Sequence, residues 1–125
     1  MESTIGPKKG EGALLWLAKI LTGVLLIVVI IIHQIANHLI VEGGLMTYAD
    51  VVVYFQNPII VAMEIFFVIF VVAHALMGLR SVILDLNPSR AALTIVNWLF
   101  VLLGSGAIIY GIYLALEIAS RKAGA

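Results

Sequence analysis

Three ionisable side chains interrupt the second half of a long apolar run between residues 58 and 86. They are His74, Arg80 and Asp85, and Gly78 lies one helical turn after His74. Ionisable groups in a segment long enough to cross a membrane are costly and are usually kept for function. A neutral imidazole is an axial ligand of haem iron, and helix bundles build such sites from inward-facing side chains. Bound haem is the sharpest explanation of this set, and a histidine that only hydrogen-bonds between helices is its alternative.

The neighbours of His74 favour the haem interpretation. Gly78 leaves room for a flat macrocycle against the helix, and Arg80 offers a propionate a charge-assisted partner. Two roles remain open for Asp85, namely an ion pair with Arg80 at the helix end or a place beside a bound quinone.

Two further histidines, His33 and His38, lie five residues apart in the first apolar run. On a helix they point in different directions and cannot flank one iron, so at most one is expected to be a ligand. His33 lies deeper, and His38 is the alternative. Helix rise favours a place for His33 nearer the far side of the membrane than His74, although the free offset between the helices leaves a common level open. Glu64 lies within the second apolar run, where a carboxyl group must be neutral or paired. It either handles protons or bonds a neighbouring helix.

Three apolar segments must position these residues, each longer than the roughly 20 residues that a membrane span needs. We expect helices over residues 13–41, 58–86 and 91–119. Residues 42–57 form a loop in which Thr47–Tyr54 is expected to make a short surface helix. Asn57-Pro58 should begin the second long helix, since proline is tolerated in a first turn. Small residues at helical spacing in the third segment allow close helix approach; they are Gly104, Ala107, Gly111 and Ala115.

Composition excludes several classes of protein. Of the 125 residues, 63% are hydrophobic and 11% are charged, whereas soluble domains have about 25% charged residues. The fold class is therefore an all-α membrane protein with three transmembrane helices. The formal net charge is zero, so nothing points to nucleic acid. The absence of cysteine excludes disulfides and iron–sulfur ligation by this chain.

The distribution of positive charge predicts the orientation. Lys8, Lys9, Lys19 and Arg90 flank one side of the spans, and residues 42–57 carry no Lys or Arg. By the positive-inside rule the N-terminus is cytoplasmic, with the late charges of residues 121 and 122 as a mild exception. The first apolar run is too long for a cleaved signal and is expected to be retained. A bacterial or archaeal cytoplasmic membrane fits best.

The string His74-x-x-x-Gly78-x-Arg80-x-x-x-x-Asp85 resembles the second-helix signature of the membrane anchor subunits of succinate dehydrogenase and fumarate reductase. Thr47-Tyr48-Ala49-Asp50 followed by Asn57-Pro58 is similar to the anchor chains of prokaryotic complexes. Length, three spans and topology agree, so the resemblance covers nearly the whole chain.

The resemblance implies a cytochrome b subunit that anchors a flavoprotein and an iron–sulfur subunit, with no dicarboxylate active site of its own. Electrons from succinate would pass to a membrane quinone. The histidine at the place of His74 would bind haem b. In di-haem members, a first-helix histidine in a stretch such as Ile31-Ile32-His33-Gln34-Ile35 binds the second haem. A second anchor chain would complete both sites within a multi-chain helix bundle.

The chain departs from the family pattern at the quinone site. The family often has Arg-x-Ser-Gly early in helix one, whereas this chain has Ile20-Leu21-Thr22-Gly23 preceded by Lys19. Lys19, Thr22 and Asp85 are therefore the candidates for the edge of a quinone site. Leu86 replaces a tyrosine of some members. Two alternatives stay open: a haem-free anchor of the same complex, and a small proton-conducting transporter subunit that uses Glu64 and the histidines.

Overall fold

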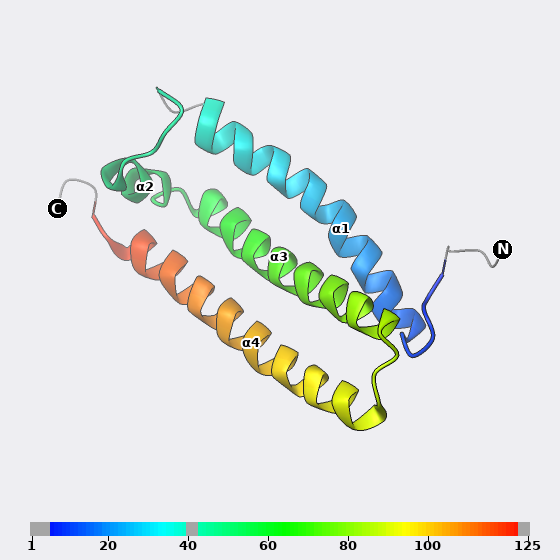
Figure 1. Ribbon diagram of the computed structural model, residues 1–125. Coiled ribbons are helices and arrows are strands. Elements are labelled where there is room, and N and C mark those ends of the chain that lie inside the picture. Colours follow the sequence, from blue (N-terminus) through cyan, green and yellow to red (C-terminus); the bar gives the residue numbers. More distant parts are fainter. Residues whose placement is uncertain (1–5, 40–42, 123–125) are drawn as a thin grey trace.

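The computed structural model describes residues 6–39 and 43–122, and within these ranges all regular structure is helical (Figure 1). Helix α1 covers Ala13–Gln34 and continues as a π-helical turn, η1, over Ile35–Leu39. A short helix α2 covers Tyr48–Tyr54. Helices α3 and α4 cover Pro58–Asp85 and Arg90–Ser120.

Three of these helical stretches are long and apolar enough to cross a membrane. They are Ala13–Leu39, Pro58–Asp85 and Arg90–Ser120, with 27, 28 and 31 residues. Their large apolar side chains are mostly exposed, as expected where lipid tails rather than water surround them. The expected all-α fold with three spans is confirmed, and the chain is a multi-pass membrane protein.

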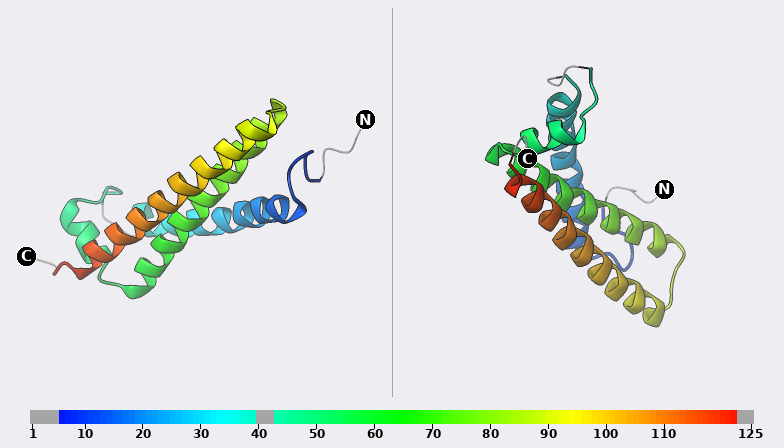
Figure 2. Two further views of the ribbon diagram at one scale, coloured as in Figure 1. Left: turned by 90° about the horizontal axis from the view of Figure 1, so that it is seen from below. Right: turned by 90° about the vertical axis from the view of Figure 1, so that its left-hand side faces the viewer.

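Helix α3 lies in the middle of the molecule. It packs against α1 along one side and against α4 along the other, and each pair is antiparallel (Figure 1). The views in Figure 2 show α1 crossing the α3–α4 pair at an angle. The three spans therefore form an open row rather than a closed bundle, and α3 carries residues that face each neighbour.

Local sequence signals explain where the helices begin. The Asn57 side chain accepts a hydrogen bond from the backbone N–H of Ile59, and Pro58 occupies the first turn of α3. Thr47 and Asp50 form a capping box at the start of α2, so the expected surface helix is present. The backbone and hydroxyl of Thr47 both donate to Asp50, and these bonds hold the pKa of its carboxyl below the usual range.

The end of α1 differs from the sequence expectation of a regular helix to residue 41. The last turn is π-helical, and residues 40–42 lie outside the described ranges. The Asn37 side chain donates to the His33 carbonyl oxygen at 2.8 Å, an acceptor that the Asn37 backbone N–H would use in a regular α-helix. This competition accompanies the widened turn.

The small residues of α4 form the contact with α3, with one exception. Gly104 and Ala115 are buried, and a Cβ added at Gly111 would lie 2.7 Å from Cγ1 of Val68. Ala107, which the sequence spacing places on the same face, is exposed. Three residues do not complete one helical turn, so Ala107 is rotated away from the line through Gly104 and Gly111.

The close approach of α4 to α3 yields a test. Val68 is β-branched and stiff, so we expect Gly111→Ala to force the helices apart and to cost about 1–3 kcal/mol. Gly106→Ala is the matched control, because a Cβ there meets nothing within 4 Å. Both variants gain the same helix propensity. Unfolding of the full chain by SDS in detergent micelles, followed by circular dichroism, should separate them; equal stability would contradict the packing.

Candidate functional site

Two groups of polar side chains lie at opposite ends of the interface between α1 and α3. We call the first the N-terminal network, made of Lys8, Glu11, Lys19, Thr22, His74, Ser81 and Asp85. The second is the His33 cluster, made of His33, Asn37, Tyr54, Glu64 and Phe67. Within the described ranges, every fully buried side-chain nitrogen or oxygen has a hydrogen-bond partner.

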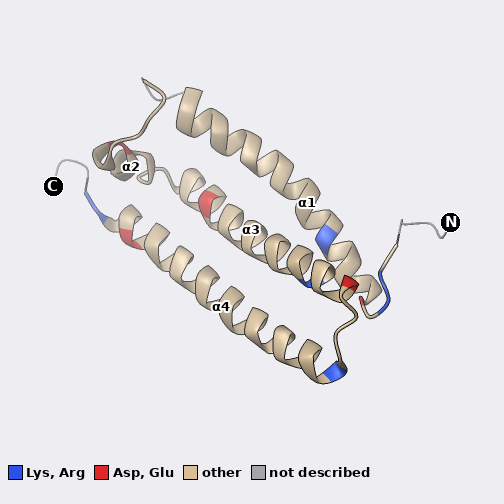
Figure 3. Cartoon of the chain, in the orientation of Figure 1, with Lys and Arg blue, Asp and Glu red and all other residues tan. Residues whose placement is uncertain are grey.

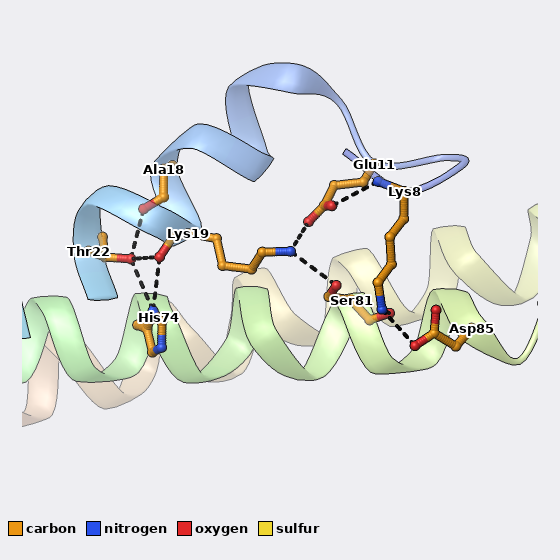
Figure 4. A network of polar contacts seen from close by, with 8 residues as sticks. All are labelled: Lys8, Glu11, Ala18, Lys19, Thr22, His74, Ser81 and Asp85. Atoms are coloured by element: carbon orange, nitrogen blue, oxygen red, sulfur yellow. Dashed lines mark hydrogen bonds and ion pairs between the residues drawn. The ribbon is translucent and has the colours of Figure 1, made fainter. Parts of the chain in front are cut away.

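The imidazole of His74 is held by the backbone and one hydroxyl of α1 (Figure 4). Its Nδ1 lies 3.1 Å from the Lys19 carbonyl oxygen and 3.3 Å from Oγ1 of Thr22. The Thr22 hydroxyl donates its own proton to the Ala18 carbonyl at 2.8 Å, so it is an acceptor toward His74. Two acceptors around Nδ1 assign the proton to that nitrogen. Nε2 therefore carries the lone pair that a metal ion needs.

The ring of His74 lies against α1 at Gly23. A Cβ built on Gly23 would lie 3.0 Å from Cε1 of His74, which is closer than a side chain normally tolerates. His74 also lines an apolar groove of about 540 Å³ between α1 and α3, together with Ile27, Phe67 and Val71. Nε2 makes no hydrogen bond to any residue in the described ranges. The ring is thus fixed at one nitrogen and free at the other.

Gly78 and Arg80 lie on different sides of α3. A Cβ at Gly78 would meet nothing within 4 Å, so the space beside it is open. Arg80 instead extends toward α4, where its Nε donates to Oδ1 of Asn97 at 2.8 Å. It lines a second groove of about 330 Å³ with Met77 and other apolar residues. Within this chain, the residue predicted to pair with a propionate and the predicted iron ligand face different grooves.

The three candidates for a quinone-site edge all have partners within the chain. Lys19 Nζ donates to Glu11 at 2.6 Å and to the Ser81 hydroxyl at 3.1 Å (Figure 4). Asp85 pairs with Lys8 at 2.6 Å. The ion pair considered between Arg80 and Asp85 is therefore wrong, because Lys8 from the segment before α1 reaches the carboxylate instead. Figure 3 shows these charges gathered where α1 begins and α3 ends.

Glu11 is a structural residue that the sequence analysis missed. Its side chain is 3% exposed, and its carboxylate accepts bonds from Lys19 and from the backbone N–H of Lys8. Burial alone would raise the pKa of Glu11, but the bond from Lys19, the backbone bond and the two lysine charges together lower it below the usual value. Glu11 precedes the first helix, so helical spacing cannot reveal its pairing with Lys19.

The His33 cluster joins α1, α2 and α3 near the other end of the spans. Glu64 Oε1 accepts a bond from the Tyr54 hydroxyl at 2.7 Å and lies 3.0 Å from Nδ1 of His33. The ring of His33 stacks on Phe67 with centroids 4.9 Å apart. Of the two roles considered for Glu64, the structure has the bonds between helices. Burial and then the bond to Glu64 raise the pKa of Tyr54, which lies outside the spans.

The bonds around His33 repeat the pattern seen at His74. The Asn37 amide donates to the His33 carbonyl at 2.8 Å and reaches the Tyr54 hydroxyl at 3.2 Å, although it also lies 3.2 Å from Nδ1. With the amide protons used in this way, Nδ1 of His33 donates to the Glu64 carboxyl oxygen. Nε2 of His33 has no hydrogen bond within the described ranges. Both imidazoles are thus bonded at Nδ1 and leave Nε2 without a hydrogen bond in the described ranges.

The two imidazoles occupy different depths along the spans. His33 stacks on Phe67, which precedes His74 by seven residues, or roughly 10 Å of helix rise. His38 is exposed, and its Nδ1 lies 2.8 Å from the carbonyl oxygen of Gly44 in the following loop. In the part of the chain that the structure describes, no group of three or more His, Asp or Glu side chains could hold a metal ion. Each imidazole is therefore considered as a separate donor.

Comparison with known proteins identifies the family. Residues 3–109 match the model of the succinate dehydrogenase/fumarate reductase transmembrane subunit family. The chain belongs to this family. A succinate dehydrogenase hydrophobic membrane anchor subunit of Archaeoglobus fulgidus is 32% identical over 105 residues, which cover 84% of this chain and 89% of that protein. No solved structure matches the chain significantly.

Membership confirms the resemblance inferred from the second apolar segment. The chain is a membrane anchor subunit of a succinate dehydrogenase or fumarate reductase complex. It is thus one part of an enzyme complex, associated with catalytic subunits and with the membrane. The matched range includes His33, Glu64 and His74, so both polar groups lie within the family region.

The buried pair of Glu11 and Lys19 yields a second test. Glu11→Gln removes the negative charge from a nearly buried contact, and we expect a loss of about 1–3 kcal/mol in the free energy of unfolding. Glu117→Gln is the control, because Glu117 pairs with Arg121 at the surface and such pairs contribute little. SDS unfolding at pH 7 measures both. Equal stabilities would contradict a structural role for Glu11.

The effect of Glu11→Gln on the free energy of unfolding should also depend on pH. The pKa of Glu11 is lowered in the folded chain, so its stabilising contribution is present above its usual value of 4.5 and is lost as the pH falls through the lowered value. We expect the free energy of unfolding of the wild type to fall on acidification as this contribution is lost. In Glu11→Gln the fall should be smaller, because the variant has no carboxylate at this position. The difference between their unfolding free energies should therefore shrink below pH 4.5.

Proposed function

We propose that this chain is a haem b-binding anchor that supports electron transfer between the catalytic subunits and a membrane quinone, with His74 as an axial ligand of haem iron. The observation that carries the proposal is the environment of His74. Its Nδ1 is held by acceptors on α1, and its Nε2 remains available beside an apolar groove.

The residues present fit a haem. Histidines that bind metals usually donate their other ring N–H to a carbonyl or carboxylate, which fixes the tautomer and raises the basicity of the ligand. His74 has the Lys19 carbonyl in this role, and His33 has Glu64. The groove at His74 falls within the range of about 300–1,000 Å³ common for cofactor sites. The open space beside Gly78 leaves room for a flat ring.

The haem, when bound, supplies one-electron transfer, and the chain's own residues hold and orient it. In this proposal Lys19 and Thr22 fix the ring of His74, while Glu64 and Phe67 fix that of His33. The apolar walls of the groove keep water from the iron. Because the two imidazoles lie at different depths, each serves a different haem, and a second anchor chain provides the remaining ligands.

The quinone is proposed to bind at the same end of the spans as the N-terminal network. With the N-terminus in the cytoplasm, this end faces the flavoprotein and iron–sulfur subunits. Lys19, Thr22 and Asp85 lie at this end, but each already bonds within the chain. They are therefore proposed to form only the edge of the site, with the main quinone contacts on the partner anchor and the iron–sulfur subunit.

The role of His74 is tested in the intact complex. We expect His74→Ala to abolish a b-type signal in the reduced-minus-oxidised spectrum, because the iron loses its ligand. His38→Ala is the control, since its ring is exposed and bonded to a loop carbonyl. Retention of the full b-type absorbance in His74→Ala would overturn the proposal. A wild-type complex without haem would establish the haem-free alternative, in which the histidines only bond between helices.

The second haem is tested separately at His33. We expect the His33→Ala complex to contain about half the haem of the wild type and to keep the signal that depends on His74. Haem is quantified by the pyridine haemochrome assay, per flavin of the purified complex. An unchanged haem content would show that His33 only bonds Glu64 and Asn37 in this position.

A further inference from the structure

We propose that Thr22 is a positioning residue that accepts, together with the Lys19 carbonyl, the Nδ1–H of His74 and thereby lowers the reduction potential of the iron that His74 binds. The inference rests on the proposed haem ligation. It assigns the Thr22 hydroxyl a role toward the histidine ligand, beyond the place at the edge of a quinone site expected from the sequence.

The direction of the bonds around Thr22 supports this assignment. The hydroxyl has one proton, and the Ala18 carbonyl oxygen, four residues earlier in α1, lies 2.8 Å away to accept it. This back-bond holds the hydroxyl in place and turns its lone pairs outward. Nδ1 of His74 lies 3.3 Å from Oγ1, so the ring N–H is shared between Thr22 and the Lys19 carbonyl at 3.1 Å. Of these two acceptors, the Lys19 carbonyl belongs to the backbone, so Thr22 is the one that a substitution can remove.

Gly23 supplies the second half of the same support. The ring of His74 contacts α1 where Gly23 lacks a side chain, and an added Cβ would lie 3.0 Å from Cε1 and 3.5 Å from Nδ1. The adjacent residues Thr22 and Gly23 thus act together on one imidazole. The first provides an acceptor, and the second provides the space that lets the ring reach it.

The chemical consequence concerns the iron. A hydrogen bond from Nδ1–H to an acceptor increases the electron density at Nε2. The imidazole then becomes a stronger electron donor to the iron. A stronger donor stabilises ferric iron more than ferrous iron and so lowers the reduction potential. Loss of the Thr22 acceptor leaves the Lys19 carbonyl oxygen, at 3.1 Å, as the one remaining acceptor on α1 for the ring N–H, and the potential should rise.

The test compares Thr22→Val with Thr22→Ser in the purified intact complex. Valine has the shape of threonine without the hydroxyl, and serine keeps the hydroxyl. We expect Thr22→Val to keep its b-type haem with a higher midpoint potential for the signal that depends on His74, measured by potentiometry at fixed pH. Thr22→Ser should restore the wild-type potential. The electron paramagnetic resonance spectrum of the oxidised haem should shift in Thr22→Val and return in Thr22→Ser.

Two further variants keep the inference falsifiable. If Thr22→Val does not assemble, Thr22→Ala carries the same comparison with serine. Gly23→Ala should displace the ring and weaken haem retention by about tenfold, within the range seen when groups supporting a metal ligand are lost.

The outcomes separate this inference from the proposed function. If His74→Ala abolishes the signal while Thr22→Val keeps the wild-type potential and spectrum, the role of Thr22 alone is overturned. If the wild-type complex has no b-type haem, or His74→Ala retains it, the proposed function fails and the inference fails with it. A potential that rises equally in valine and serine variants would indicate a packing effect and would overturn the role of the hydroxyl.

Discussion

The contact between the His74 ring and the backbone of α1 is the constraint on which the rest of this structure depends. The contact requires a residue without a side chain at position 23 and the backbone carbonyl oxygen of Lys19 as an acceptor. It therefore sets how closely α1 approaches α3. Lipid tails provide no hydrophobic force to bring two helices together, and close packing and hydrogen bonds must do so. A single imidazole supplies both here.

Polar bonds at the two ends of the same interface then fix how far α1 slides along α3. Lys19 donates to Ser81 near the end of α3, and His33 bonds Glu64 near its beginning. A shift of one helical turn would break both sets of contacts together. The cost of placing ionisable groups in lipid is thus offset by pairing, and the pairing defines one register.

The sequence was sufficient for the three spans, the helix starts and the family. These features depend only on residues that are close together in the sequence. They are the long apolar runs, the Asn57-Pro58 pair and the spacing from His74 to Asp85. Pairings across helices were harder. The partner of Asp85 is Lys8 rather than Arg80, and Arg80 bonds Asn97, because these choices depend on which helix lies beside each face of α3. The π-helical turn accompanies a hydrogen bond from the Asn37 side chain in η1 to the His33 carbonyl oxygen.

The open row of spans has a consequence for assembly. A closed bundle must be parted before another helix can reach its interior, whereas a row with α3 in the middle leaves broad faces of its helices uncovered by the rest of the described chain (Figure 2). The polar side chains between α1 and α3 bond within the chain, apart from Nε2 of His33 and of His74, for which the described residues provide no partner. Each chain can therefore complete its own fold in the bilayer and join its neighbours as a rigid body, exchanging lipid contacts for protein contacts.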